Sequence, residues 1–157
     1  MKKLFASVLV VSMLVLAGCE VAPSFDYEVT EESSSVATSQ LLYEDDKVKV
    51  SFVEIFEMPE LVGTCYLRLR VENKSDKTVT VSLKDSYVND TAQMIGSGIP
   101  MVLGQGMKSL TPFFFGYGNL GINSKDEINK IAFKVWLMDD DYNTVVETES
   151  LVIDLSK

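Results

Sequence analysis

Histidine is absent from the 157 residues of this chain. Its absence removes the commonest general base, the commonest metal-ligating side chain and the side chain that changes charge near neutral pH. Serine and cysteine nucleophiles therefore lack their usual activating base, and the sequence contains no GxSxG motif. We expect a chain that is not an enzyme and that carries no cofactor.

Basic residues are also scarce. The chain has 14 Lys and Arg against 23 Asp and Glu, which gives a net charge of −9. Nucleic acids and anionic lipid headgroups are both negatively charged, so they would be repelled by such a chain. The charge therefore indicates a solvated exported surface and no nucleic-acid partner.

No apolar run is long enough to cross a bilayer as a helix. The longest runs from Leu4 to Ala17 and has 14 residues, whereas a spanning helix needs about 20. Lys2 and Lys3 precede it, and a positive start followed by a short apolar run is typical of a signal peptide.

The residues Leu16-Ala17-Gly18-Cys19 end this run. They resemble the lipobox of bacterial lipoprotein precursors. The resemblance implies cleavage before Cys19 and attachment of a diacylglycerol to its thiol, so that residues 1–18 are a signal peptide that is removed. Two acyl chains on one cysteine would anchor the protein stably on the extracytoplasmic side of the membrane.

The predicted mature chain, 19–157, has 12 basic against 23 acidic residues and a net charge of −11. Cys65 is then the second and last cysteine, so an exported chain has no disulfide framework. Cys65 shares strand phase with Leu67 and Leu69, which predicts a buried thiol that packs as a small hydrophobic side chain.

Segment 19–42 begins with the lipidated cysteine and continues as an acidic linker. Between residues 20 and 42 it holds five acidic residues, no basic residue and the run Ser33-Ser34-Ser35. This composition predicts a disordered tether between the membrane and a folded domain.

From residue 43 onward the hydrophobic period is two, which is the strand signal. A change of phase near 52–53 predicts a β-bulge. The turn residues Asn73-Lys74-Ser75-Asp76 lie between two alternating segments, which predicts a hairpin of strands 64–73 and 78–83. The remaining expected elements are strands at 47–57, 92–95, 110–115, 131–137 and 144–155, and one helical turn at the capping box Ser124-Lys125-Asp126-Glu127.

About seven or eight short strands with regular turns predict an all-β fold, a sandwich of two antiparallel sheets. The order of strands and turns resembles the immunoglobulin-like domains of small exported lipoproteins of Gram-positive bacteria, most of unassigned function. The resemblance covers residues 45–155 and supplies no catalytic residue, and the expected domain is 43–157. It is carried by Leu67–Ser75, Thr78–Leu83, Tyr87–Asp90 and Phe133–Asp139.

Asp139-Asp140-Asp141-Tyr142-Asn143 begins like a calcium-binding loop. Asp139, Asp141 and Asn143 are thus a weak candidate for a metal site. The sixth position is Thr144 where such a loop has Gly, and the twelfth is Ser150 where it has Glu. A solvated turn between two strands is the favoured interpretation.

The segment from Met94 to Gly121 is unusually apolar for a region so rich in glycine. Successive strand residues point to opposite faces, so Phe114 cannot share a face with Phe113 and Phe115. One interpretation is an irregular part of the core. The other is a partner-binding surface made by Met101, Met107, Phe114 and Tyr117.

Together these features favour a membrane-anchored binding or accessory module. Its expected partners are the membrane, through lipid on Cys19, and a protein or cell-wall component. Two alternatives stay open: a hydrolase that uses converging carboxylates or a metal, and a small-molecule-binding decoy with a closed apolar cavity.

Overall fold

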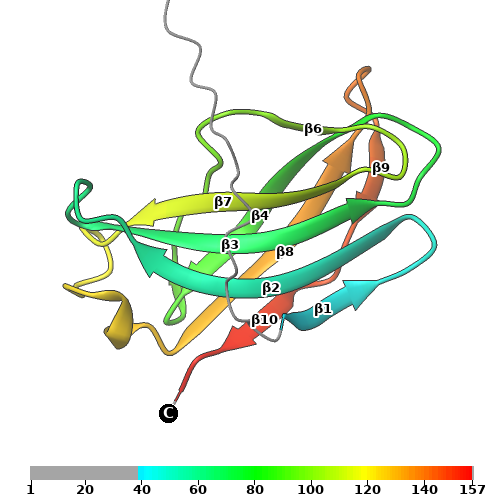
Figure 1. Cartoon of the computed structure of the whole chain (residues 1–157). Helices are drawn as coiled ribbons and strands as arrows, with labels where there is room; N and C mark the ends of the chain where they lie inside the picture. The colour runs from blue at the N-terminus through cyan, green and yellow to red at the C-terminus, as the bar shows by residue number, and fades with distance from the viewer. Residues whose placement is uncertain (1–38, 157) are drawn as a thin grey trace, which may run out of the picture. The chain divides into compact units, whose positions relative to one another are not determined.

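The computed structural model describes residues 39–156, which form ten strands and one short 3-10 helix (Figure 1). The strands are β1 (Gln40–Glu44), β2 (Val48–Glu57), β3 (Thr64–Asn73), β4 (Val79–Val88), β5 (Thr91–Ala92), β6 (Met101–Leu103), β7 (Lys108–Gly116), β8 (Lys130–Met138), β9 (Thr144–Glu147) and β10 (Leu151–Asp154). The helix η1 is Lys125–Glu127. The predicted signal peptide, the predicted lipidation site Cys19 and nearly all of the expected linker lie outside the described residues. None of the helices within 39–156 has the length and hydropathy needed to span a bilayer.

Two antiparallel sheets pack face to face, which confirms the predicted all-β sandwich. One sheet has the order β1-β2-β3-β7, and the other has the order β10-β8-β4-β5, with β6 added to β4 and β9 added to β8. The order β2-β3-β7 opposite β10-β8-β4 is that of strands A-B-E and G-F-C in immunoglobulin domains. Figure 1 shows β1, β2, β3 and β7 as one layer, with β8 and β10 in the layer behind.

Alternation along the strands builds the core between the sheets. In β8 the residues Ile131, Phe133, Val135 and Leu137 are fully buried, and the residues between them are partly exposed. β3 and β7 alternate in the same way. The core also includes Val48, Val50, Cys65, Leu67, Leu69, Val71, Val79, Val81, Phe113, Phe115 and Ile153.

The predicted hairpin of strands 64–73 and 78–83 is wrong. β3 pairs with β2 and β7, whereas β4 pairs with β5, β6 and β8, so the chain crosses between the sheets at residues 74–78. The crossing depends on buried Asn73, whose side-chain amide donates to the carbonyl oxygens of Lys77, Leu103 and Gly104. Its side-chain oxygen accepts from the N–H and hydroxyl of Ser75. A turn sequence alone cannot distinguish a hairpin from such a crossover.

Other boundaries differ in detail. β1 begins at Gln40, inside the segment expected to be linker, and pairs with β2. The strand expected at 92–95 is reduced to β5, and β6 was not predicted. The expected strand 144–155 is divided into β9 and β10, because the buried hydroxyl of Thr148 accepts the N–H of Val135 in place of a backbone carbonyl. The predicted bulge is confirmed by a register shift between Phe52 and Glu54.

Candidate binding face

The outward side of the sheet β1-β2-β3-β7 carries the strongest candidate site, which we call the binding face. The cross-strand register defines it, because residues paired across neighbouring strands point to the same side. At one end, Phe56 pairs with Tyr66, which pairs with Phe114. At the other end, Lys49 pairs with Glu72, which pairs with Lys108.

The apolar end is a row of three aromatic rings from three strands. The ring centres of Phe56 and Tyr66 are 5.1 Å apart and stacked, and those of Tyr66 and Phe114 are 6.1 Å apart. Tyr66 is only 9% exposed although it points away from the core, while Phe114 at the end of the row is 39% exposed. The row therefore presents its most exposed ring, Phe114, at one end, beside Tyr66, which in turn stacks on Phe56.

A glycine loop runs beside Phe114. The backbone N–H and carbonyl of Gly96 pair with those of Phe114, which adds a single bridge at the free edge of β7. Gly98 has φ +48°, and a Cβ atom there would lie 3.2 Å from the Phe114 ring. Glycine is needed at this position both for the positive φ and for the close approach to the ring.

The middle and the other end of the face are charged. Arg68 pairs with Glu54, Lys49 lies 3.1 Å from Glu44, and Lys108 lies 3.1 Å from Glu72. Arg70, between Ser51 and Leu110 in the register, is exposed and forms no ion pair with any other residue of 39–156.

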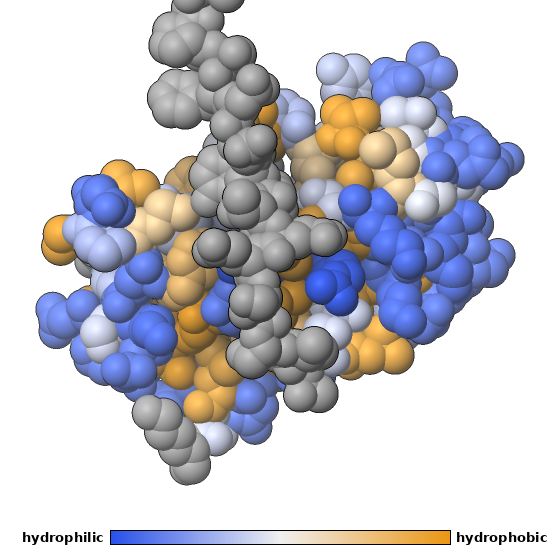
Figure 2. Space-filling view, viewed as in Figure 1, coloured by the Kyte–Doolittle hydropathy of each residue, from blue (hydrophilic) through white to orange (hydrophobic). Residues whose placement is uncertain are grey.

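A hollow of about 360 Å³ opens in this charged end, and we call it the cationic hollow. It is lined by Ser39, Lys49, Ser51, Arg70, Glu72 and Lys108. Figure 2 looks onto this sheet and shows mostly hydrophilic surface toward the end where β2 and β7 begin, and hydrophobic residues among hydrophilic ones toward the end where they finish. The binding face is therefore divided into an aromatic half and a cationic half.

The four residues predicted as a partner surface do not gather on one face. Phe114 lies on the binding face, and Met107 is 56% exposed in the turn between β6 and β7. Met101 lies in β6 of the other sheet, and both it and Tyr117 are buried with the core. Strand phase places Phe114 correctly, but the burial of Met101 and Tyr117 depends on the packing of distant strands.

Cys65 is fully buried against the aromatic end of the core, as its phase predicted. Burial raises the pKa of its thiol from 9.0 to about 11. Nearby, the Tyr117 hydroxyl donates to Glu57, and burial followed by this hydrogen bond raises the pKa of Tyr117. Both groups stay protonated at neutral pH, so they offer no nucleophile.

The Asp139 turn has the geometry of a solvated hairpin. The carboxylate of Asp139 accepts from the N–H groups of Asp141 and Asn143 and lies 2.7 Å from the Lys77 ammonium. The Lys77 hydrogen bond is the main cause that lowers the pKa of Asp139. No group of three His, Cys, Asp or Glu side chains suited to a metal ion occurs within 39–156.

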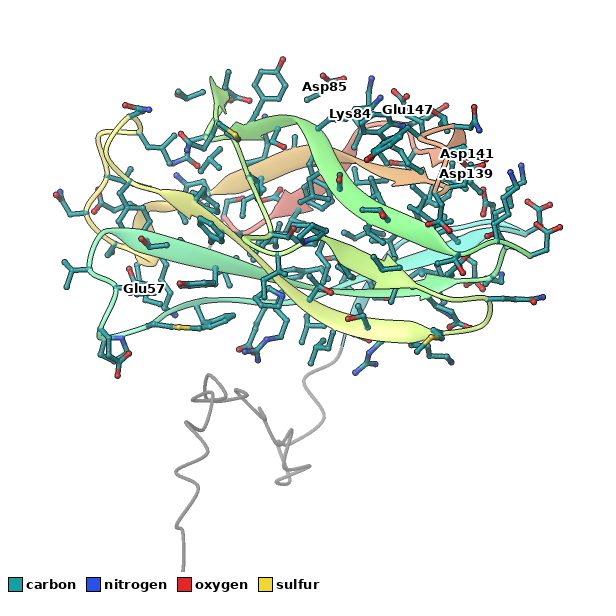
Figure 3. All side chains as sticks on the ribbon, turned by 90° about the horizontal axis from the view of Figure 1, so that it is seen from above. Glu57, Lys84, Asp85, Asp139, Asp141 and Glu147 are labelled. Carbon is teal, nitrogen blue, oxygen red and sulfur yellow. The ribbon has the colours of Figure 1, made fainter. Side chains whose placement is uncertain are left out.

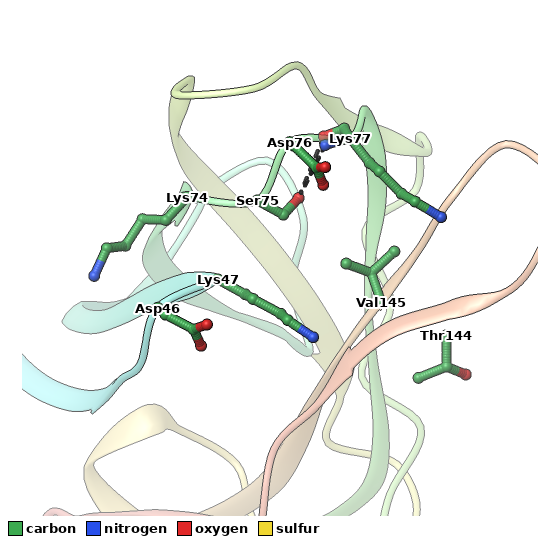
Figure 4. A pocket seen from close by; sticks show the side chains of 8 residues that line it. All are labelled: Asp46, Lys47, Lys74, Ser75, Asp76, Lys77, Thr144 and Val145. Carbon is green, nitrogen blue, oxygen red and sulfur yellow. Dashed lines mark hydrogen bonds between the residues drawn. The ribbon is translucent and has the colours of Figure 1, made fainter.

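A second hollow, of about 390 Å³, lies at the end of the sandwich where residues 74–78 cross from one sheet to the other (Figure 4). Lys47, Lys74 and Lys77 line it together with Asp46, Asp76, Ser75, Thr144 and Val145. Lys74 is bound to Glu44 and Lys77 to Asp139. This hollow is charged and open, unlike the closed apolar cavity that the small-molecule hypothesis requires.

The acidic residues labelled in Figure 3 do not converge in one place. Glu57 lies at one end of the sandwich, and Asp139 and Asp141 lie at the other. On the outward side of the second sheet, Glu147 is held 2.6 Å from Lys84, and Asp85 is held 2.8 Å from Lys134. Those charges satisfy one another, in contrast to Arg70 on the binding face.

Phe56, Tyr66 and Arg68 were not identified as site residues from the sequence. The signal was present, since Tyr66, Arg68 and Arg70 alternate with core residues and so share the outward side of one strand. What joins them to Phe56 and Phe114 is the pairing of β3 with β2 and β7, which no local pattern contains.

The fold and this face define an all-β sandwich with immunoglobulin-type strand order and an aromatic, cationic outer sheet. No protein-family model matches the chain, and no curated protein matches it. A solved structure described as "Crystal structure of FixG-related protein from Vibrio parahaemolyticus" is similar at a TM-score of 0.36 and 18% sequence identity, over 71% of this chain and 99% of that chain. At this TM-score the likeness does not bear on function.

Proposed function

We propose that this protein is a lipid-anchored extracytoplasmic lipoprotein whose sandwich acts as a non-catalytic binding module. The anchor is supported by Lys2, Lys3, the apolar run to Ala17 and the lipobox that ends in Cys19. Two acyl chains on Cys19 would hold the domain at the membrane. The partner is a protein or a cell-wall component that meets the domain outside the cytoplasm.

The observation that carries the binding role is the exposed Phe114 ring at the end of the aromatic row. Large aromatic side chains are enriched at the centres of protein interfaces, because they bury much area at a small cost in conformational entropy. Arg68 stands beside the row and supplies a charged group at its border. An exposed aromatic ring that is rigidly supported and flanked by arginine is the composition of a binding hot spot.

Replacing Phe114 with Asp tests this role in cells. The ring is on the solvent side of an edge strand, so the fold is expected to persist while recovery of the partner from solubilised membranes falls at least tenfold. The matched control is Val152→Asp, the same kind of change at a residue that is 50% exposed on the other sheet. Equal recovery with Phe114→Asp and the wild type would refute binding through this face.

The anchor has its own test. Cys19→Ala should stop lipidation, and globomycin should cause the precursor to accumulate. Processing that continues unchanged in treated cells would show that Cys19 is not the lipidation site, whatever the binding face does.

A further inference from the structure

Strand β7 carries an exposed line of apolar side chains along one border of the binding face. Leu110, Pro112 and Phe114 stand at every second position of the strand, and all three are exposed. Residues at every second position point to the same side, so these three side chains form a line about 13 Å long. Leu110 is 47% exposed and Phe114 is 39% exposed. We call Leu110, Pro112 and Phe114 the apolar stripe.

The free edge of β7 is unsuited to an added strand. The backbone N–H and carbonyl of Phe114 point away from β3 and are already bonded to Gly96. The register between β3 and β7 has no shift, so the backbone of Pro112 faces the same way as that of Phe114, and proline has no N–H. This edge therefore offers no continuous row of donors. A ligand of the stripe is recognised by side chains and not by strand addition.

A positive charge without a partner lies at one end of the stripe. Arg70 stands opposite Leu110 in the register and forms no ion pair with any other residue of 39–156. Lys108 is bound to Glu72, but its side chain is still 62% exposed. Arg70 and Lys108 both line the cationic hollow. A guanidinium group binds a carboxylate through two parallel hydrogen bonds, so a carboxylate is the group that complements Arg70.

The charge balance of the binding face favours a single carboxylate over a polyanion. The face has four basic side chains and three acidic ones, and each of the three acids already holds one of the basic residues. A polymer with a negative charge on every unit would bring further charges against those acids, and like charges repel. The basic residues are Lys49, Arg68, Arg70 and Lys108, and the acidic residues are Glu44, Glu54 and Glu72.

We propose that the partner of the binding face is an extended segment of another protein, which places the side chain of an Asp or Glu against Arg70 and Lys108 and apolar side chains on the stripe. Side chains on one side of an extended segment recur at every second residue. The fitting pattern is therefore an acid with large apolar residues two and four positions away. This inference names the partner of the proposed binding module and so rests on that proposed function.

Selection from a displayed library of random peptides tests the inference with the unlipidated chain 19–157 that carries Cys19→Ser. The enriched peptides are expected to contain the acid and apolar pattern at least three times as often as the starting library. Arg70→Glu should weaken their binding at least tenfold, and 0.5 M salt should weaken it as well. Replacing the acid of an enriched peptide with Lys should abolish binding to the wild type and restore binding to Arg70→Glu.

Two matched controls separate recognition from stability. Lys130→Glu reverses a charge on the outward side of the other sheet, at a side chain that is 41% exposed, and should change peptide binding less than twofold. Leu110→Thr removes an apolar side chain from the stripe and should weaken binding at least tenfold. Val152→Thr, at a residue that is 50% exposed on the other sheet, should have no effect. Thermal unfolding of each variant shows that the fold is kept.

The outcomes distinguish this inference from the proposed function. Peptides that bind Arg70→Glu as tightly as the wild type, yet lose binding to Phe114→Asp, would overturn the acidic partner and leave the binding face in place. Peptides that bind Phe114→Asp and the wild type equally would refute the binding face itself. Polygalacturonate serves as the polyanion probe. If it binds the wild type and Leu110→Thr equally but fails to bind Arg70→Glu, the face belongs to an anionic polysaccharide and the inference is wrong.

Discussion

The guanidinium carbon of Arg68 lies 4.2 Å from the centre of the Phe56 ring, and the same guanidinium binds Glu54, two residues earlier on β2. One side chain of β3 thus holds a ring and a carboxylate of the neighbouring strand. It fixes the orientation of Phe56, on which Tyr66 stacks.

Arg68→Ala should lower the free energy of unfolding by about 1 kcal/mol. Partly exposed cation–π contacts and surface ion pairs each contribute about 0.2 to 1 kcal/mol, and this substitution removes one of each. Arg68→Lys keeps the charge but loses the planar stacking on Phe56. Its free energy of unfolding should therefore lie between those of Arg68→Ala and the wild type. Urea unfolding at pH 7 measures both variants. A lysine variant as stable as the wild type would mean that the stacking on Phe56 contributes nothing.

The side chain of Asn73 holds the crossover between the two sheets in place. Asn73→Ala removes the donors to three carbonyl oxygens and should cost about 3 kcal/mol, because buried acceptors are left without partners. Asn129→Ala, at an exposed residue, is the control and should change stability by less than about 0.5 kcal/mol. A loss below 1 kcal/mol for Asn73→Ala would show that backbone hydrogen bonds alone hold the crossover.

The buried thiol of Cys65 should make the protein less stable at alkaline pH. Its pKa is raised by burial to about 11 in the folded chain and is 9.0 ordinarily, so the unfolded chain loses this proton first. Stability is therefore complete below pH 9 and falls as pH rises from 9 to 11. Between pH 9 and pH 11 the free energy of unfolding of the wild type should fall more steeply with pH than that of Cys65→Ala.

The same burial makes the Cys65 thiol unreactive. In the Cys19→Ser chain, a thiol reagent at pH 8 should react with Cys65 only after urea unfolds the protein. Rapid reaction in the absence of urea would show that Cys65 is accessible in solution.

Calcium should not stabilise the protein through the Asp139 turn. The Asp139 carboxylate is already occupied by Lys77 and by two N–H groups of its own turn. Millimolar calcium is thus expected to leave the melting temperature of the wild type unchanged. An increase in melting temperature that disappears in Asp139→Asn would restore the turn as a metal site.

How much the sequence predicts is clearest on β3. Alternation alone assigned Cys65, Leu67, Leu69 and Val71 to the core and Tyr66, Arg68 and Arg70 to the other side, and the structure agrees. The partners of the outward residues could not be predicted in this way. Phe56 and Phe114 lie far from Tyr66 in sequence, and only strand pairing brings the three rings together.

The turn at 73–78 marks the same limit. Asn, Lys, Ser and Asp favour a turn through their own short hydrogen bonds, and that local preference is satisfied equally by a hairpin and by a crossover. Asn73 favours the crossover, because its side-chain amide donates to the carbonyl oxygens of Leu103 and Gly104, which lie 30 and 31 residues later in the chain.

The sequence by itself determined the class of fold, the buried sides of the long strands, the lack of histidine chemistry and the prediction of a lipid anchor at Cys19. Each follows from local pattern or composition, which needs no knowledge of neighbours. Tertiary structure alone decided that Met101 and Tyr117 are buried, that Phe114 extends a row of rings, and that Arg70 stands without an ion-pair partner among residues 39–156. These depend on which strands lie side by side, and that is set by the packing of both sheets over one core.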